Sequence, residues 1–180
     1  MPGSLTTLIL PGVGNSGPEH WQSRWLALHP EFHRVLQDDW DRPDLDAWCR
    51  NLETVVHDAP SPVVLVAHSL GCLLAVQWEQ RTSLLVRGAL LVAPPDPAST
   101  AFPPEAAGFG PVPLRRLPFP SILVASTNDP YGTSEFSRNC AASWGSRLVE
   151  VGPLGHINAA SGLGEWRQGL KLYDELLRSS

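Results

Sequence analysis

The sequence is poor in charge. Charged residues make up only 17% of its 180 residues, and the formal net charge is −5. We therefore expect no basic surface for nucleic acid or for an anionic membrane. Hydrophobic residues reach 43%, so the chain can bury a core, which excludes intrinsic disorder as its main state. The length is typical of one domain, and we expect residues 1–180 to form one.

Cysteine is also scarce. Cys49, Cys72 and Cys140 lie far apart and form no CxxC pair, which argues against a disulfide framework and a zinc site. We expect no metal, no cofactor and a reducing, cytoplasmic location. Hydrophobic runs such as Leu84–Ala93 are too short to span a bilayer, and residues 1–5 lack a secretory signal pattern. Because no large unpaired apolar stripe is evident, we expect a monomer.

Short apolar runs alternate with amphipathic segments. The apolar runs predict six strands, over Thr6–Leu10, Arg34–Gln37, Val63–Ala67, Val86–Val92, Ile122–Ser126 and Arg147–Val151. Apolar residues three and four apart predict five helices, over Pro18–Leu28, Asp44–His57, Leu70–Arg81, Ser134–Trp144 and Gly164–Leu177. Five tryptophans on these helices are expected in the core, namely Trp21, Trp25, Trp48, Trp144 and Trp166. The alternation indicates an α/β fold, with a mainly parallel sheet covered by helices on both faces.

The alternation stops between Pro94 and Pro118. This stretch is rich in proline and carries Phe102 and Phe109. A long loop inside a compact domain usually covers or binds a ligand. We therefore expect residues 94–118 to form a lid or loop, with Phe102 and Phe109 at an apolar substrate pocket.

A nucleophile motif follows the third predicted strand. The chain runs from the strand into Ala67-His68-Ser69-Leu70-Gly71 and then into a predicted helix. This is the G-x-S-x-G turn with alanine in place of its first glycine, and it raises a serine hydroxyl above the edge of the sheet. Small residues on either side of the serine let the strand and the helix pack closely. Ser69 is therefore the predicted nucleophile.

A serine nucleophile needs a base, and the base needs an acid to orient it. In this type of fold the chain order is serine, acid, histidine. Asp129 follows the fifth predicted strand and His156 follows the sixth, so both lie where open α/β sheets place their sites. Asp96 and Glu150 are the rival acids, although Asp96 follows the preceding strand and Glu150 lies within a strand. The prediction is a catalytic triad of Ser69, Asp129 and His156.

Two backbone N–H groups are expected to stabilise the oxyanion. We expect one from Leu70 and the other from Val13, in the glycine-containing loop after the first strand. Further residues could line the substrate pocket: Gly12, Gly14, His20, Trp40 and His68. For His20 a role at the helix start is favoured over a role in the pocket, and His68 is expected to pack or bond locally. Cys72 is expected to be a small apolar filler.

Six short motifs are spread over nearly the whole chain. They are Leu10-Pro11-Gly12, Glu19-His20-Trp21, Asp39-Trp40, Ala67-His68-Ser69-Leu70-Gly71, Asn128-Asp129-Pro130 and Gly155-His156. Together they resemble the small serine hydrolases related to retinoblastoma-binding protein 9 and the bacterial YdeN-like proteins. The resemblance implies a compact α/β-hydrolase fold with strand order 2-1-3-4-5-6. It also implies the triad Ser69, Asp129 and His156, and a serine-hydrolase reaction. The loop with Phe102 and Phe109 favours a small or hydrophobic ester, or a similar acyl bond, as the substrate.

Two rival functions remain open at this point. Residues 12–17 match G-x-G-x-x-G, and Asp38 follows the next predicted strand, which is the pattern of a nicotinamide-dependent oxidoreductase. Pro11 and the position of Gly17 before Pro18 weaken this alternative. The other alternative is a protein-binding module that keeps the hydrolase scaffold without catalysis. A complete triad argues against it, since a scaffold needs none of the three residues.

Overall fold

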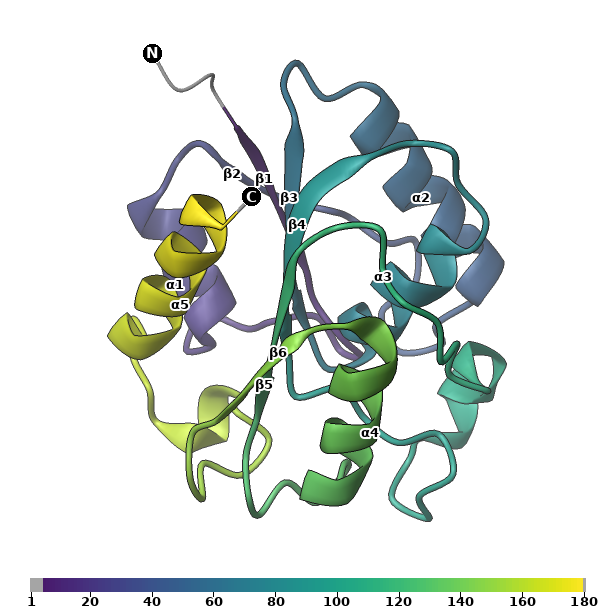
Figure 1. The fold of residues 1–180 in the computed structure, drawn as a ribbon, viewed down its shortest axis with the longest axis vertical. Coiled ribbons are helices and arrows are strands. Elements are labelled where there is room, and N and C mark those ends of the chain that lie inside the picture. Colours follow the sequence, from purple (N-terminus) through teal and green to yellow (C-terminus); the bar gives the residue numbers. More distant parts are fainter. Residues whose placement is uncertain (1–4, 180) are drawn as a thin grey trace.

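The computed structural model describes residues 5–179 and contains a six-stranded sheet (Figure 1). The strands are β1 (Thr6–Leu10), β2 (Phe32–Arg34), β3 (Val63–His68), β4 (Val86–Val92), β5 (Ser121–Ala125) and β6 (Arg147–Glu150). Their order is β2-β1-β3-β4-β5-β6, and every neighbouring pair is parallel. The predicted α/β fold and strand order are confirmed.

Helices cover both faces of this sheet. They are α1 (Trp21–Leu28), α2 (Leu45–His57), α3 (Leu70–Glu79), α4 (Ser134–Trp144) and α5 (Arg167–Arg178). Figure 1 shows α1 and α5 on one side of the sheet, and α2, α3 and α4 on the other. Strands covered on both faces must be apolar on both faces, and all residues of β1, β3 and β5 are buried. None of the described helices is long and apolar enough to cross a membrane.

Each face has its own hydrophobic core. Trp48, Trp78 and Trp144 are buried in the core under α2, α3 and α4. Trp21, Trp25 and Trp166 are buried in the core under α1 and α5. All five tryptophans predicted for the core are at most 4% exposed. Large rings at these positions fill the space between sheet and helices, which fixes the strand ends that carry the site.

Three predicted elements are wrong by three residues at one end. Helix α1 begins at Trp21 rather than at Pro18, because the His20 ring caps it by accepting a hydrogen bond from the Gln22 N–H. Strand β2 spans Phe32–Arg34 rather than Arg34–Gln37, since the ladder with β1 is formed by Phe32, His33 and Arg34. Helix α5 begins at Arg167 rather than at Gly164, because Trp166 takes a left-handed conformation with φ of 42°.

Residues 94–118 are held against α3. A short 3₁₀ helix, η1 (Pro104–Phe109), lies within this stretch. The Gln77 amide on α3 donates to the carbonyl oxygens of Phe109 and Pro111 at 3.0 and 2.9 Å. The ring of Phe109 is fully buried and packs edge-on against Trp48, with ring centroids 5.4 Å apart. The prediction that Phe109 faces the substrate is therefore wrong, because its ring anchors the segment in the core.

Candidate active site

Ser69 lies on the sharp turn between β3 and α3. Its φ of 55° and ψ of −125° are sparsely populated for a residue other than glycine. The turn is possible because Gly71 has no side chain: a Cβ there would lie 2.2 Å from the carbonyl oxygen of Leu10. The close approach of β1 to the start of α3 thus holds the Ser69 hydroxyl at the carboxyl end of the sheet.

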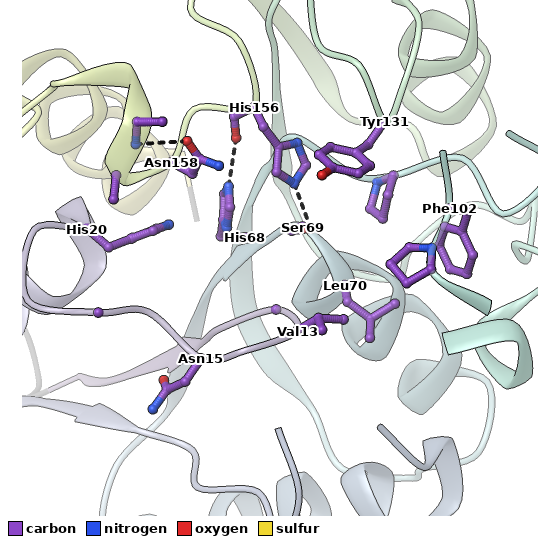
Figure 2. A pocket seen from close by; sticks show the side chains of 16 residues that line it. Val13, Asn15, His20, His68, Ser69, Leu70, Phe102, Tyr131, His156 and Asn158 are labelled. Carbon is purple, nitrogen blue, oxygen red and sulfur yellow. Dashed lines mark hydrogen bonds between the residues drawn. The ribbon is translucent and has the colours of Figure 1, made fainter. Parts of the chain in front are cut away.

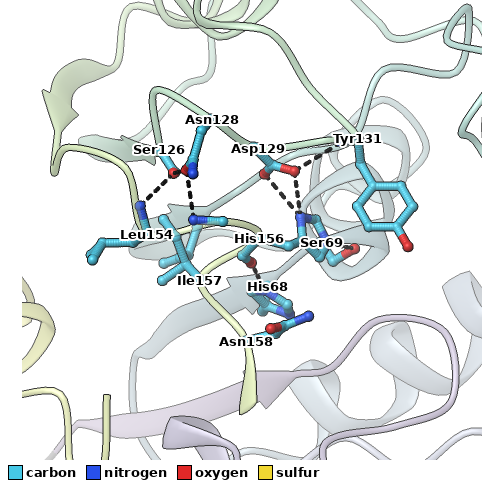
Figure 3. A network of polar contacts seen from close by, with 12 residues as sticks. His68, Ser69, Ser126, Asn128, Asp129, Tyr131, Leu154, His156, Ile157 and Asn158 are labelled. Carbon is cyan, nitrogen blue, oxygen red and sulfur yellow. Dashed lines mark hydrogen bonds and ion pairs between the residues drawn. The ribbon is translucent and has the colours of Figure 1, made fainter. Parts of the chain in front are cut away.

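The structure brings Ser69, His156 and Asp129 into one chain of hydrogen bonds (Figure 3). The Nε2 of His156 lies 2.8 Å from the Ser69 Oγ. The Nδ1 of the same ring lies 2.9 and 2.8 Å from the two carboxylate oxygens of Asp129. The side chains of His156 and Asp129 are only 10% and 3% exposed. This is the geometry of a serine, a base and the acid that orients it.

The rival acids have other partners. Asp96 accepts a hydrogen bond from the backbone N–H of Ala98. Glu150 forms an ion pair with Arg138 at 3.1 Å, and both side chains are partly exposed. Asp129 is the acid that contacts His156, and its Oδ1 also accepts the backbone N–H of Tyr131 at 2.9 Å.

A second network fixes the loop that carries His156. The Oδ1 of Asn128 accepts the backbone N–H of Gly155 at 2.7 Å and the hydroxyl of Ser126 at 2.9 Å. The Ser126 hydroxyl in turn accepts the backbone N–H of Leu154 at 2.9 Å. These bonds tie the end of β5 to the loop after β6 (Figure 3). Ser126 was not predicted as a site residue, whereas Asn128 belongs to the Asn-Asp-Pro motif.

Backbone N–H groups lie close to the Ser69 hydroxyl. Leu70 is the first residue of α3, so its N–H has no acceptor within the helix. A Cβ on Gly12 would lie 3.2 Å from the Leu70 nitrogen and 3.3 Å from the Ser69 Oγ. Gly12 therefore leaves open a space that is bounded by both groups. An oxyanion formed next to Ser69 would occupy this space.

The loop after β1 is fixed by its backbone. The N–H of Gly14 donates to the Trp40 carbonyl at 2.8 Å, and the N–H of Asn15 donates to the Gly12 carbonyl at 3.2 Å. Neither bond uses the N–H of Val13, and Val13 lines the cavity above Ser69. Val13 therefore remains the predicted second donor to the oxyanion.

A cavity of about 500 Å³ opens above Ser69 (Figure 2). It has an apolar end, formed by Leu70, Pro95, Phe102, Pro103 and Tyr131. Its polar end is formed by His20, His68 and Asn158. Figure 2 shows Phe102 and Tyr131 on one side of Ser69, and His20 and Asn158 on the other.

Not every residue expected in the pocket lines it. Gly12, Val13, His20, His68, Leu70 and Phe102 do. Gly14, Trp40 and Phe109 are not among the described lining residues. The Trp40 ring packs edge-on against Trp48 instead, at 5.5 Å between centroids, while its carbonyl holds the loop after β1.

Tyr131 and Asn158 line the cavity, and the sequence analysis missed both. The Tyr131 ring contacts the His156 ring, with centroids 4.6 Å apart. Tyr131 follows Asp129 by two residues, so the Asn-Asp-Pro turn was the available signal for it. Asn158 is brought in by the loop conformation at Ile157, which has a positive φ of 49°. No sequence pattern predicts a positive φ at Ile157.

Three histidine rings follow one another from His20 through His68 to His156. The ring centroids are 4.6 Å apart in the first pair and 5.0 Å apart in the second. Burial, and then the charges of His156 and Arg34, lower the pKa of His20 to about 4. Burial also lowers the pKa of His68 well below its ordinary value. Both rings are therefore neutral at pH 7.

The glycine loop does not lead directly into a helix. Gly17 precedes the His20 cap of α1 by three residues. A dinucleotide-binding loop instead places its last glycine in close helix–strand packing, and nothing lies within 4 Å of a Cβ built on Gly17. The close helix–strand contact is made by Gly71 at the start of α3.

The cysteines are buried apolar residues. Cys49, Cys72 and Cys140 are free and buried. Burial raises the pKa of Cys72 well above its ordinary value, so it stays a thiol, in keeping with the expected filler. Residues 5–179 contain no group of three His, Cys, Asp or Glu side chains able to hold a metal ion.

Comparison with known families decides the class of protein. The family model described as Serine hydrolase matches residues 7–175. The chain belongs to this Serine hydrolase family. Membership implies hydrolase activity on a small-molecule substrate, and it makes the nicotinamide-dependent alternative unnecessary. No curated protein sequence matches the chain.

One solved structure agrees with this assignment, and two more distant ones share the fold alone. A YdeN-like hydrolase from Pectobacterium atrosepticum is 35% identical with a TM-score of 0.86, over 96% of this chain and 90% of that one. The ydeN gene product of Bacillus subtilis is 20% identical with a TM-score of 0.79, over 98% and 100%. Carboxylesterase CesB from B. subtilis is 12% identical with a TM-score of 0.68, over 100% and 86%, a likeness of fold alone. The predicted resemblance to YdeN-like serine hydrolases is confirmed.

Proposed function

We propose that this serine hydrolase cleaves a small or hydrophobic carboxylic ester through an acyl-enzyme on Ser69. The observation that carries the proposal is the 2.8 Å contact between the His156 Nε2 and the Ser69 Oγ, with Asp129 on the far nitrogen of the ring. His156 takes the proton of Ser69 as its oxygen attacks the ester carbon. The protonated His156 then donates this proton to the departing alcohol.

The tetrahedral intermediate carries its negative charge in the space next to Gly12. The N–H groups of Leu70 and Val13 are the proposed donors to this oxyanion. Asp129 accepts the Nδ1–H of His156, so it fixes the tautomer and stabilises the imidazolium. In the second half of the reaction, His156 activates a water molecule that releases the acid and regenerates Ser69.

The apolar end of the cavity supports the choice of substrate. Leu70, Phe102 and Pro103 offer a nonpolar wall beside Ser69, and each buried methylene contributes about 0.8 kcal/mol to binding. An acyl chain that reaches this wall gains binding energy that acetate lacks. A carboxylesterase among the proteins of similar fold is in keeping with this chemistry.

The proposal is tested with nitrophenyl esters of increasing acyl length. We expect kcat/KM to rise from acetate to medium-length chains. Replacing Ser69→Ala should reduce kcat by about 10⁴-fold or more. Ser83→Ala is the matched control, because Ser83 is exposed and lies outside the cavity. Equal rates for the two variants would refute the proposal.

A further inference from the structure

The His20 side chain uses only one of its two nitrogens within the protein. Its Nδ1 accepts the backbone N–H of Gln22 at 3.1 Å and so caps α1. The ring must therefore carry its proton on Nε2. Among the described residues, nothing accepts a hydrogen bond from this Nε2. The residue is only 5% exposed, so water at the surface does not satisfy the donor either.

Capping alone does not explain a histidine here. Serine, threonine and aspartate cap helices well with a short side chain, and none of them carries a side-chain N–H. An unpaired buried donor lowers stability, and native structures keep few such groups. Since His20 lines the cavity above Ser69, the free donor has a position from which it can serve a ligand.

A second donor lies at the same end of the cavity. The Asn158 Oδ1 accepts the backbone N–H of Ala160 at 3.1 Å, which leaves the Nδ2 of the amide on the other side. Figures 2 and 3 both show this amide beside His68. The His20 ring meets His68 edge-on, with centroids 4.6 Å apart. His20 and Asn158 thus flank the same ring from two different elements.

The charge behind these donors is positive. Arg34 donates to the Asn15 Oδ1 at 2.7 Å, to the Ser16 carbonyl at 3.1 Å and to the Ser23 hydroxyl at 2.6 Å. All three acceptors are neutral, and Arg34 forms no ion pair with any described carboxylate. Its charge helps to lower the pKa of His20 to about 4, after burial and the charge of His156. His20 is therefore a neutral donor at pH 7, in a region of positive potential.

We propose that the polar end of the cavity binds a carboxylate of the substrate, with His20 as its direct hydrogen-bond donor. The substrate is then an ester with two distinct halves. One half is apolar and lies against Phe102, and the other carries a carboxylate that reaches His20 and Asn158. The inference rests on the proposed esterase function of Ser69, because it specifies the substrate class of that same site.

The test compares esters that differ only in a terminal carboxylate. Nitrophenyl monoesters of adipic acid are compared with nitrophenyl hexanoate and with the methyl ester of the same adipate. Aryl acetates with and without a ring carboxylate test the alcohol half in the same way. We expect kcat/KM for the carboxylate to exceed the uncharged partners by about tenfold in one of the two series, the effect of one good hydrogen bond to a charged group.

The variant His20→Asn keeps an oxygen at the helix cap, and its shorter side chain places no donor where the ring Nε2–H lies. We expect it to reduce the carboxylate preference by about tenfold, mainly through KM. His33→Asn is the matched control, because His33 lies exposed on β2. Three results would overturn the inference. The first is a wild-type kcat/KM for the carboxylate ester at or below that of the uncharged esters in both series, and the second is an equal gain for the methyl ester. The third is an unchanged kcat/KM ratio in His20→Asn.

Fluorophosphonate labelling separates this failure from a failure of the proposed function. The reagent carries no carboxylate and reports only an activated serine. If Ser69 is labelled while the carboxylate preference is missing, the esterase proposal survives and the carboxylate site is refuted. If Ser69 is not labelled, the esterase proposal itself fails, and the substrate class that depends on it is refuted as well.

Discussion

The Nε2–H of His68 donates a hydrogen bond to the backbone carbonyl of His156 at 2.9 Å. His68, which precedes the nucleophile Ser69, thus holds the backbone of the base His156. His68 belongs to the end of β3 and His156 to the loop after β6, so one side chain links two distant loops. The Nε2–H is a donor in this neutral tautomer and in a protonated ring alike, so this bond does not depend on pH.

Replacing His68→Phe should slow catalysis without preventing folding. Phenylalanine keeps an aromatic ring between His20 and His156 but cannot hold the His156 carbonyl. We expect kcat to fall about 10- to 100-fold with a small change in KM, because a displaced base is poorly aligned with Ser69. The fluorophosphonate labelling rate should fall by the same factor. A folded variant with kcat within twofold of wild type would contradict the positioning role.

Gly12→Ala should remove activity by filling the oxyanion space. The new Cβ would lie 2.9 Å from the Ser69 Cβ and 3.2 Å from the Leu70 nitrogen. We expect kcat/KM to drop by about 10²- to 10³-fold, the loss typical of a damaged oxyanion hole. Gly108→Ala is the control, since nothing lies within 4 Å of its Cβ. Activity of both variants at the wild-type level would argue against the assigned space.

Gly71→Ala should affect stability more than any other glycine near Ser69. Its Cβ would lie 2.2 Å from the Leu10 carbonyl oxygen, which belongs to the central sheet and cannot move freely. We expect the free energy of unfolding to fall by at least about 3 kcal/mol, as for other severe overpacking. Urea denaturation measures this change, with Gly108→Ala again as the control. A loss below about 1 kcal/mol would show that β1 and α3 can separate easily.

The buried histidines should make the fold sensitive to acid. The pKa of His20 is about 4 in the folded protein against 6.5 for a free side chain, so the unfolded chain binds more protons between these values. Stability is therefore complete above pH 6.5 and is lost as pH falls toward 4.

His20→Asn isolates the contribution of one histidine. Between pH 7 and pH 5, the wild type should lose about 2 kcal/mol more unfolding free energy than this variant, at about 1.4 kcal/mol per pH unit. His68, His156 and Arg34 face or influence the ring and are the same in both proteins. Urea titrations at the two pH values give the difference. Parallel losses in the two proteins would show that folding does not lower the pKa of His20.

The sheet and the grouping of Ser69, Asp129 and His156 could be predicted because short-range signals specify them. Strands buried on both faces read as unbroken apolar runs, such as Val63–Ala67, and the turn around Ser69 has a recognisable motif. Asp129 and His156 follow from the order of acid and base after the nucleophile. Each of these inferences needs only the chain order and the position of a residue relative to a strand end.

Several details of the pocket could not be predicted, because they depend on local conformations with no sequence pattern. Pro18 suggested a helix start, but α1 begins at Trp21 because the His20 ring accepts the hydrogen bond of the Gln22 N–H. Trp40 follows the second strand as expected, but its carbonyl rather than its ring serves the site. Asn158 reaches the cavity only because Ile157 adopts a positive φ. In each case a single hydrogen bond or a backbone conformation decided which part of the residue faces the site.

The most direct test of Ser69 as the nucleophile is the mass of the intact protein after incubation with a fluorophosphonate. The hydrogen bonds from Ser69 to His156 and on to Asp129 predict one covalent adduct on the wild type. The adduct should be absent from Ser69→Ala and should form about 10⁴-fold more slowly in Asp129→Asn, which loses the tautomer control of His156. No adduct on a folded wild type, or an adduct that persists in Ser69→Ala, would contradict the assignment of Ser69 as the nucleophile.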